Sequence, residues 1–475
     1  MSSGREIKAG VGYTIGNIFI KGMVFISLPI FSRLLTTEQF GIYNTYMAYE
    51  AILAILLGLG MYSSIKNAKI DYPDKVDVYV STLLKITLIP LISAILCAVF
   101  AGSLFSDFLG LNRSILLLLI FQSYGSAMLS ISNSRLSLDY NYKKYLGFAA
   151  FNTILNVGLS LVLILFIFSD QREFGRIVGS AVPLIIIGIY VFAYYTRKGG
   201  NRFEGSMAKY GLSIGLPLIW HYLSQQIQNQ FDRIAITKIV GASATGIYSF
   251  AYTVANILQV MFYSTENVWS VWMYDQMSKR NYTAIREASK KYILLISSIA
   301  ILMLVGSREV ILIMGDKEYW EGATIFIPIL IGIYLLFLYT IPAGIEYYYK
   351  KTKYIAIMTA IAAFVNITLN FALIPCFGYI IAAYTTMLSY AVQFAAHWII
   401  SDRVLKNEGA PKIYYISDLM KMFFIVCLAG VAVNYLNPYP VFKYALFTVF
   451  FGVLAYVRRD DVRTLILMLR KRKNT

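Results

Sequence analysis

The chain has 475 residues, of which 58% are hydrophobic and only 14% are charged. Because a soluble domain is typically about 45–50% apolar and about 25% charged, this composition excludes an ordinary soluble protein and indicates an integral membrane protein. Three cysteines exclude a disulfide framework, and the net charge of +17 does not indicate nucleic-acid binding here, because the basic residues separate apolar segments.

Apolar segments long enough to cross a bilayer follow one another along the whole chain. A span needs about 20 mainly apolar residues, and the first segment, 10–34, is too long for a removable signal peptide. Short connections leave no room for a soluble domain. Fourteen spans are predicted, at 11–34, 39–62, 84–102, 114–134, 146–169, 174–195, 209–232, 244–266, 291–314, 322–347, 354–375, 379–400, 416–436 and 442–457.

Lysine and arginine residues alternate between the two sides of these spans. With the N-terminus in the cytoplasm, 30 of them fall on the cytoplasmic side and 9 on the opposite side. Cytoplasmic loops of membrane proteins carry such an excess of basic residues. The sequence therefore predicts an even number of spans, with both termini in the cytoplasm.

An internal repeat relates the first six predicted spans to the next six. The segment Phe40–Asn44 recurs as Thr245–Ser249 at an offset of 205, and Ile154–Asn156 recurs as Phe364–Asn366 at an offset of 210. An offset of an even number of spans implies a parallel repeat, which places a transport site between the halves. We therefore predict an all-α polytopic membrane protein in which two parallel six-helix lobes surround a central cavity. The predicted divisions are an N-lobe at 1–200, a C-lobe at 201–405, and a C-terminal helix pair with a basic cytoplasmic tail at 406–475.

Several segments, in this order and spacing, resemble one superfamily of exporters. They are Leu28–Thr36 with Phe40–Tyr43, Phe231–Arg233, Gly246–Tyr248, Lys350–Lys353 and Asn366–Asn370. The chain resembles the polysaccharide transporter branch of the multidrug/oligosaccharidyl-lipid/polysaccharide exporter superfamily, that is, Wzx-like flippases of O-antigen and capsule repeat units. It departs from that pattern at Ile381, where a second glycine is expected, and in having fourteen rather than twelve spans. Lipid II flippases therefore stay open as an alternative.

The resemblance implies a transporter rather than an enzyme, in the bacterial cytoplasmic (inner) membrane. Its cargo would be an oligosaccharide on an undecaprenyl diphosphate carrier, moved from the cytoplasmic to the outer leaflet by alternating access for surface polysaccharide biosynthesis. Its partners would be this lipid-linked glycan, membrane lipids and other polysaccharide assembly proteins, and the two C-terminal helices would hold the isoprenoid tail. No cofactor is expected. Because the chain lacks a Gly-x-x-x-x-Gly-Lys-Ser/Thr motif, the energy would come from an ion gradient, such as one of H⁺ or Na⁺, or from the gradient of the substrate itself.

Two ionisable residues fall near the middle of the first two predicted spans, Lys21 and Glu50. Such residues usually face a cavity or a partner, because a charge in contact with lipid is costly. Lys21 would attract the carrier diphosphate as a point charge. The alternative is a structural pair between Lys21 and Glu50.

The seventh predicted span, 209–232, is the most polar one. Amides and aromatic rings suit a sugar, because each amide both donates and accepts hydrogen bonds. The alternative is hydrogen bonding between packed helices. The residues predicted to line a substrate cavity in this span are His221, Tyr222, Gln225, Gln226, Gln228 and Asn229.

Five charged residues near span ends are candidates for gates. Arg33, Asp232 and Arg233 lie near the outer ends, where plain interfacial exposure is the alternative. Glu266 and Glu346 lie near the cytoplasmic ends, beside Lys290 and Lys350. His221 and His397 would titrate with a coupling proton, although a hydrogen-bonded histidine is the simpler interpretation of His397.

Three other functions remain to be weighed. A lipid II-type flippase and an ion-coupled multidrug exporter belong to the same superfamily, and the exporter would favour an acidic cavity, for which Glu50 is the candidate. A membrane glycan polymerase is disfavoured, because the chain has neither a large extramembrane loop nor a metal-binding Asp-x-Asp motif.

Overall fold

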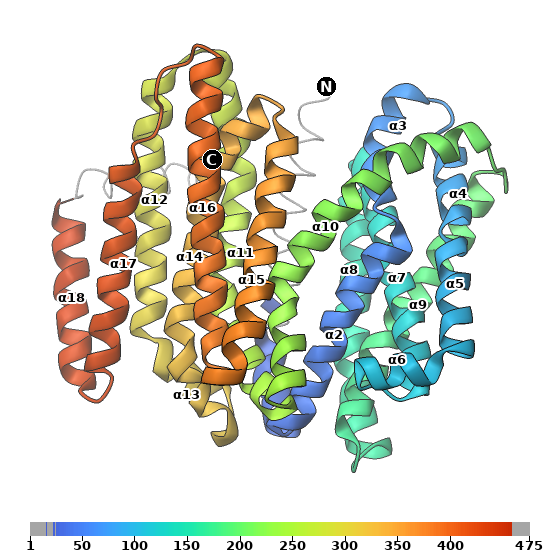
Figure 1. The fold of residues 1–475 in the computed structure, drawn as a ribbon, viewed down its shortest axis with the longest axis horizontal. Helices are drawn as coiled ribbons and strands as arrows, with labels where there is room; N and C mark the ends of the chain where they lie inside the picture. The colour runs from blue at the N-terminus through green and yellow to red at the C-terminus, as the bar shows by residue number, and fades with distance from the viewer. Residues whose placement is uncertain (1–15, 17–21, 24, 458–475) are drawn as a thin grey trace, which may run out of the picture.

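The computed structural model describes residue 16, residues 22–23 and residues 25–457. This part of the chain contains the helix Phe25–Leu34 and the 17 α-helices α2–α18 (Figure 1). Their bounds are α2 Thr37–Gly58, α3 Ile65–Asp71, α4 Val76–Ile86, α5 Leu88–Phe100, α6 Gly102–Leu109, α7 Arg113–Leu138, α8 Tyr142–Val162, α9 Arg172–Lys198, α10 Gly205–Ile239, α11 Ala242–Ser278, α12 Tyr282–Val305, α13 Ser307–Met314, α14 Ala323–Tyr348, α15 Thr352–Phe377, α16 Ile381–Asn407, α17 Ile416–Leu436 and α18 Pro440–Val457. Three shorter helices are η1 Met61–Ser64, η2 Leu163–Ile167 and η3 Lys317–Gly322.

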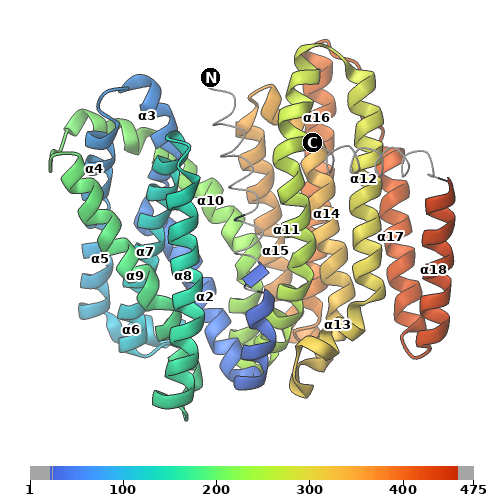
Figure 2. The ribbon, with the colours of Figure 1, turned by 180° about the vertical axis from the view of Figure 1, so that it is seen from behind.

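The helices form two groups that lie side by side. Figures 1 and 2 show α2–α9 on one side and α11–α18 on the other, with α10 running obliquely between them. We call these the N-terminal group and the C-terminal group. Each has its own cluster of buried apolar side chains, and the helix Phe25–Leu34 contributes residues such as Phe31 to the C-terminal cluster. Hydrophobic residues thus separate into two cores rather than one.

Helix α10 packs against both groups. In its first half, a Cβ at Gly211 would lie 2.5 Å from Leu83 Cδ2, and a Cβ at Gly215 would lie 2.6 Å from the Leu59 carbonyl oxygen. Its second half packs on α11 and α15 of the C-terminal group. Pro217, which removes one hydrogen bond from the helix interior, lies in the half of α10 that packs on the N-terminal group.

The protein is a multi-pass membrane protein. In the described part of the chain, nine helices or pairs of consecutive helices are long and apolar enough to cross a bilayer. Three further helices, α10, α11 and α16, have 35, 37 and 27 residues but are more polar. Many of their polar side chains are buried against other helices, which removes these groups from contact with lipid.

The predicted spans differ from the helices in three places. The span 84–102 is the second half of a longer unit, Val76–Phe100, in which α4 gives way to α5 at Thr87. The Thr87 hydroxyl donates to the Leu84 carbonyl oxygen at 2.7 Å, and such local bonding competes with regular helix. Helix α6 was not predicted, because it is only eight residues long, and the predicted span 291–314 is divided at Gly306 into the end of α12 and the short helix α13. Residues 11–15, 17–21 and 24 of the span 11–34 lie outside the described residues, and the described part of this span includes the helix Phe25–Leu34.

An ion pair between a buried lysine and a partly exposed glutamate attaches the last helix to the rest of the protein. Lys443 of α18 is fully buried, and its Nζ lies 2.6 Å from Glu309 Oε1 of α13 and 3.1 Å from Asn437 Oδ1. Arg308 Nη1 donates to the Asn437 carbonyl oxygen at 2.9 Å. These polar contacts join α18 to the end of the C-terminal group.

Replacing Lys443 by Met should destabilise the detergent-solubilised protein by about 2–3 kcal/mol, because Glu309 would lose its charged partner. Thermal unfolding followed by tryptophan fluorescence would measure the loss. The double variant Lys443→Met/Glu309→Gln should recover part of the stability, and Lys421→Met, at an exposed position on α17, should have little effect. Equal melting temperatures for Lys443→Met and Lys421→Met would show that the pair contributes nothing.

Candidate functional site

The two helix groups touch closely where α2 meets α11. A Cβ at Gly41 would lie 1.8 Å from the Ala242 carbonyl oxygen, and a Cβ at Gly246 would lie 1.9 Å from the Thr37 carbonyl oxygen. Gly41 and Gly246 are the same position of the internal repeat, at the offset of 205. Only glycine permits this approach, so the backbones of the two groups are in direct contact. We call this contact the α2–α11 joint.

Hydroxyl groups surround the α2–α11 joint. Thr37 Oγ1 lies 2.7 Å from Ser243 Oγ. Thr45 Oγ1 lies 2.6 Å from Thr237 Oγ1 of α10, which in turn lies 2.6 Å from Thr245 Oγ1. These hydrogen bonds run from α2 to both α10 and α11, so they fasten the N-terminal group to the C-terminal group.

The segment before α2 adds further bonds at the same place. Arg33 Nη2 donates to the Ile313 carbonyl oxygen at 3.0 Å, and Ser32 Oγ donates to the Met314 carbonyl oxygen at 2.8 Å. The Tyr319 hydroxyl donates to the Leu35 carbonyl oxygen at 2.9 Å. Arg33, a gate candidate from the sequence, thus lies beside the α2–α11 joint. Its role as a gate stays a prediction.

A buried polar cluster surrounds Asp232 inside the C-terminal group. Asp232 Oδ2 accepts hydrogen bonds from the hydroxyls of Tyr248 and Thr386, both at 2.6 Å, and Oδ1 accepts one from Asn370 Nδ2 at 2.6 Å. Asn366 bonds Thr386 at 3.0 Å and Asn370 at 3.2 Å, and Thr385 donates to Asn370 Oδ1. These six residues come from α10, α11, α15 and α16, and none is more than 3% exposed. We call them the Asp232 cluster.

No basic side chain pairs with Asp232 among the described residues. Its neighbour Arg233 points elsewhere: Nη1 donates to the Asn229 carbonyl oxygen at 2.7 Å, and the guanidinium lies 4.8 Å from the centre of the Tyr252 ring. An unpaired carboxylate is costly in a membrane interior. The cluster offers one carboxylate and several neutral oxygen atoms, which suit a proton or a hard cation.

The N-terminal group carries a cluster at the same position of the repeat, with the opposite charge. Arg176 Nη1 donates to Asn156 Oδ1 at 2.5 Å and to Ser160 Oγ at 2.7 Å. At the offset of 210, Asn156, Ser160 and Arg176 correspond to Asn366, Asn370 and Thr386 of the Asp232 cluster. We call these three residues the Arg176 cluster.

Arg176 has aromatic rings, not a carboxylate, as its remaining neighbours. Its guanidinium lies 4.0 Å from the centre of the Phe31 ring and 4.4 Å from that of Tyr43, and Tyr43 corresponds to Tyr248 in the repeat. Its Nε is buried without a partner in the described part of the chain. The N-terminal group therefore holds a tethered cation where the C-terminal group holds an anion.

The predicted cavity residues of α10 divide into two sets. Gln228 and Asn229 bond to α16: Gln228 Nε2 donates to Gln393 Oε1 at 2.9 Å, and the Tyr390 hydroxyl donates to Asn229 Oδ1 at 3.1 Å. This is the helix-to-helix bonding that the sequence left open as the alternative. The second set is His221, Tyr222, Gln225 and Gln226, all half-buried.

The second set of α10 residues makes fewer hydrogen bonds to other helices than Gln228 and Asn229 do. The Tyr222 ring lies 5.0 Å from that of Tyr62 in the N-terminal group, and His221 Nδ1 is buried without a partner within the described chain. The side chains of Gln225 and Gln226 have no hydrogen-bond partner among the described residues, so they are the free amides of α10.

Glu50 lies inside the N-terminal group. It is 6% exposed, and its Oε1 accepts a hydrogen bond from Ser126 Oγ of α7 at 2.5 Å. One turn earlier, the Tyr46 hydroxyl donates to Gln122 Oε1 at 2.8 Å. Lys21 lies outside the described residues, so the proposed pair between Lys21 and Glu50 stays a prediction.

The two remaining gate candidates lie on α11 and α14. Glu266 is half-buried on α11, and Lys290 pairs with Glu287 at 3.0 Å. Glu346 is fully buried and pairs with His397 Nδ1 at 2.9 Å rather than with Lys350. His397 is thus hydrogen-bonded, as the simpler interpretation of the sequence expected, and the gate roles of Glu266 and Glu346 stay predictions.

The sequence analysis missed the partners of Asp232. Asn366 and Asn370 entered the sequence interpretation only as parts of a resemblance, and Arg176 entered only as one of the nine basic residues placed opposite the cytoplasmic side. The repeat contained the missing signal, because Asn156 and Asn366 aligned at 210. The same offset of 210 pairs Ser160 with Asn370 one helical turn further on, and Arg176 with Thr386 on the following helix of each half.

The fold defines a class of membrane transporter. The structure matches that of a lipid II flippase, MurJ, in an inward closed conformation with a TM-score of 0.70 and 15% identity, over 92% of this chain and 98% of that one. It matches an inward-facing multidrug resistance MATE family transporter of the MOP superfamily with a TM-score of 0.63 and 15% identity, over 83% of this chain and 99% of that one. The fold is therefore that of the MOP superfamily of transporters.

The chain belongs to the polysaccharide biosynthesis protein family. The family model matches residues 7–269, which are more than half of this chain. Lsg locus putative protein 1 of Haemophilus influenzae is 23% identical over 362 residues, which are 74% of this chain and 87% of that protein. A probable low-salt glycan biosynthesis flippase of Haloferax volcanii is 22% identical over 394 residues, or 82% of each chain. The resemblance drawn from the sequence is confirmed, and the family is one of transporters rather than enzymes.

The α2–α11 joint should not tolerate a side chain at Gly41. In a background without native cysteines, Thr37→Cys/Ser243→Cys should cross-link under mild oxidation, because the native oxygen atoms are 2.7 Å apart. Adding Gly41→Leu should reduce the cross-linked fraction by about tenfold, since the Cβ would overlap the Ala242 carbonyl.

Gly147→Leu is the matched control for this experiment. Gly147 is an exposed glycine of α8 with no atom within 4 Å of where its Cβ would lie. This variant should cross-link like the parent. Undiminished cross-linking in Gly41→Leu would show that the glycine contact does not hold the two groups together.

Proposed function

We propose that the protein is a flippase for an undecaprenyl-diphosphate-linked oligosaccharide repeat unit, which it moves from the cytoplasmic to the outer leaflet of the bacterial inner membrane. The product would serve the biosynthesis of a surface polysaccharide such as O-antigen or capsule. The observation that carries the proposal is the family match over residues 7–269. The relative named as a probable glycan biosynthesis flippase and the fold shared with a lipid II flippase support it.

The proposed architecture has fourteen spans. The nine apolar spans, the three long polar helices α10, α11 and α16, and the two shorter apolar helices Phe25–Leu34 and Pro440–Tyr456 together supply that number. The N-lobe would comprise residues 1–200 and the C-lobe residues 201–405, with α17 and α18 outside the repeat. Both termini would be cytoplasmic, as the distribution of basic residues indicates.

The transport movement would be a rocking of the two lobes about a central cavity. Because Gly41 and Gly246 bring the two backbones into contact, the α2–α11 joint would be the outer gate in its closed state. Opening it would separate Thr37 from Ser243 and Thr45 from Thr237, four hydroxyls that water can solvate once the lobes part. A gate of neutral hydroxyls is cheaper to open than one of buried ion pairs, since no charge must be left unpaired.

The cargo would be held by the free polar groups of α10. Gln225 and Gln226 have unused donors and acceptors, and Tyr222 presents an aromatic ring beside them. Together with His221 and Lys21 they would contact sugar hydroxyls and the diphosphate, the groups of an oligosaccharide carrier that need polar partners. Gln228 and Asn229 would position this face of α10 through their bonds to α16.

Coupling to an ion gradient would use the Asp232 cluster. The repeat supports this assignment, because the Arg176 cluster places its own guanidinium where Thr386 stands in the Asp232 cluster. The N-lobe would thus carry a fixed cation, whereas the C-lobe would take up an exchangeable one, H⁺ or Na⁺. Uptake would neutralise the carboxylate and bring α10, α15 and α16 together.

A proteoliposome assay tests the transport function. Purified protein would be reconstituted with undecaprenyl-diphosphate-linked oligosaccharide, and an external glycosidase would report the glycan that reaches the outer leaflet. A multi-sugar unit should be flipped in preference to lipid II. A preference for lipid II would support the alternative of a peptidoglycan precursor flippase, to which the shared MurJ fold lends some support. Expulsion of a cationic dye without glycan movement would support the multidrug exporter.

In the same assay, Asp232→Asn should lower ion-driven flipping by at least about tenfold, because the amide cannot bind H⁺ or Na⁺ as a carboxylate does. The remaining activity should be independent of the imposed gradient. Asp74→Asn, at an exposed position between α3 and α4, is the matched control and should flip like the native protein. A fully gradient-dependent Asp232→Asn protein would remove the Asp232 cluster from the coupling role.

A further inference from the structure

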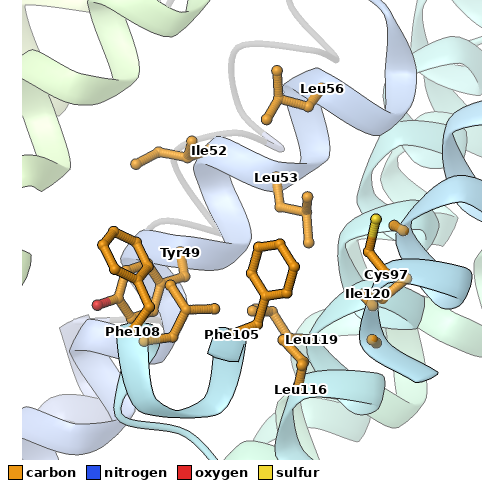
Figure 3. A pocket seen from close by; sticks show the side chains of 13 residues that line it. Tyr49, Ile52, Leu53, Leu56, Cys97, Phe105, Phe108, Leu116, Leu119 and Ile120 are labelled. Atoms are coloured by element: carbon orange, nitrogen blue, oxygen red, sulfur yellow. The ribbon is translucent and has the colours of Figure 1, made fainter. Parts of the chain in front are cut away.

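An apolar pocket opens in the N-terminal group, away from the two polar clusters. It has a volume of about 340 Å³ and lies between α2, α5, α6 and α7. Figure 3 shows Leu53 of α2, Cys97 of α5 and Phe105 of α6 pointing into it. Its volume is within the range of small-molecule sites, roughly 300–1,000 Å³, and its walls carry almost no polar atoms.

The mouth of this apolar pocket is accessible from the bilayer. Leu56 and Phe105 line the pocket and are about 40% exposed, at 41% and 38%. Helix α5 also presents Ile92, Leu96 and Val99 at the protein surface, as expected of a span that faces lipid. The pocket thus opens at an exposed apolar surface, and its apolar walls suit an apolar chain.

A second pocket adjoins the first one; most of its lining is apolar, and we call it the polar pocket only because two charged side chains also line it. It has a volume of about 470 Å³ and shares Tyr49, Phe108 and Leu109 with the apolar pocket. Its other walls include Lys238 of α10 and Asp107 of α6. The two pockets together form one elongated site with an apolar part and a polar part, the shape of an amphiphile.

The charges of the polar pocket indicate the kind of head group. Lys238 and Asp107 are both exposed, and they form no ion pair with each other in the described chain. Lys238 Nζ instead lies 3.8 Å from the centre of the Phe108 ring. One free cation and one free anion in a single pocket complement a ligand that carries both charges. A diphosphate would meet the Asp107 carboxylate and be repelled.

We propose that this site binds one zwitterionic bilayer phospholipid with a phosphate and an amine in its head group. An acyl chain lies in the apolar pocket, the phosphate contacts Lys238, and the ammonium contacts Asp107. This lipid site does not depend on the cargo proposed above, because it requires only that the protein spans a membrane.

The bound lipid would bridge the two helix groups. The apolar pocket belongs to the N-terminal group, whereas Lys238 follows Thr237, which bonds Thr45 beside the α2–α11 joint. The head-group contacts therefore exist only while the end of α10 stays beside α6. A phospholipid in this site stabilises the closed α2–α11 joint.

Native mass spectrometry of the purified full-length protein tests the proposal. The protein would be equilibrated in detergent with equal amounts of palmitoyl-oleoyl phosphatidylethanolamine, phosphatidylglycerol and undecaprenyl phosphate. We expect one tightly held phosphatidylethanolamine, preferred by about tenfold over phosphatidylglycerol, as one charge-assisted hydrogen bond would give. Equal retention of the three lipids, or a preference for undecaprenyl phosphate, would overturn the zwitterionic assignment.

Charge variants test the head-group contacts. Asp107→Asn should abolish the preference for phosphatidylethanolamine while leaving phosphatidylglycerol bound. Lys238→Gln should weaken retention of both phospholipids by about tenfold, because each has a phosphate. Lys317→Gln, at an exposed position on η3, is the control and should retain lipid like the native protein. Unchanged selectivity in Asp107→Asn would remove the ammonium contact.

Substitutions at two cysteines test whether the apolar pocket holds the acyl chain. Cys97 and Cys376 are both exposed, but only Cys97 lines the apolar pocket. Cys97→Trp should fill the pocket and release the lipid, whereas Cys376→Trp on α15 should not. Melting temperatures of the two variants without added lipid would show whether both fold. If folded Cys97→Trp held phosphatidylethanolamine as tightly as Cys376→Trp does, the apolar pocket would not be the binding site.

Discussion

The direct contact between two helix backbones at Gly41 and Gly246 determines how the two halves of this protein meet. Each glycine removes a Cβ that would overlap a carbonyl oxygen of the opposite helix, at 1.8 Å and 1.9 Å. The small residues let Thr37, Thr45 and their partners come within hydrogen-bonding distance. In a membrane, where apolar side chains gain little by leaving lipid, such close packing and hydrogen bonding are the main forces between helices.

The internal repeat acquires a chemical meaning from the two buried clusters. Asn156 and Ser160 hold the guanidinium of Arg176, and the corresponding Asn366 and Asn370 belong to the cluster around the carboxylate of Asp232. The same framework thus carries a cation in one half and an anion in the other. Burying either charge costs free energy that only polar neighbours can offset. The two halves share this framework but differ in the charge that it holds.

Helix α10 connects these features, because it belongs to both halves. Its first half packs on the N-terminal group through Gly211 and Gly215, and its second half carries Asp232 into the C-terminal group. A change at the Asp232 cluster therefore reaches Thr237, which bonds α2, within two helical turns. The end of α10 also supplies Lys238 to the pocket beneath α6. One helix thus links the ion cluster, the α2–α11 joint and the lipid pocket.

Composition and apolar run length were enough to identify a polytopic helical membrane protein, and motif order was enough to identify the family. Both properties are local, because a span must satisfy its own backbone hydrogen bonds whatever lies beside it. The partners of Asp232 and Glu346 were not predictable in this way, since Asn370 and His397 lie 138 and 51 residues away along the chain. The short helix α6 and the break between α12 and α13 also escaped prediction, because packing rather than length defines them. Hydropathy records only whether a residue avoids water, so the tertiary structure alone decided which buried polar groups meet.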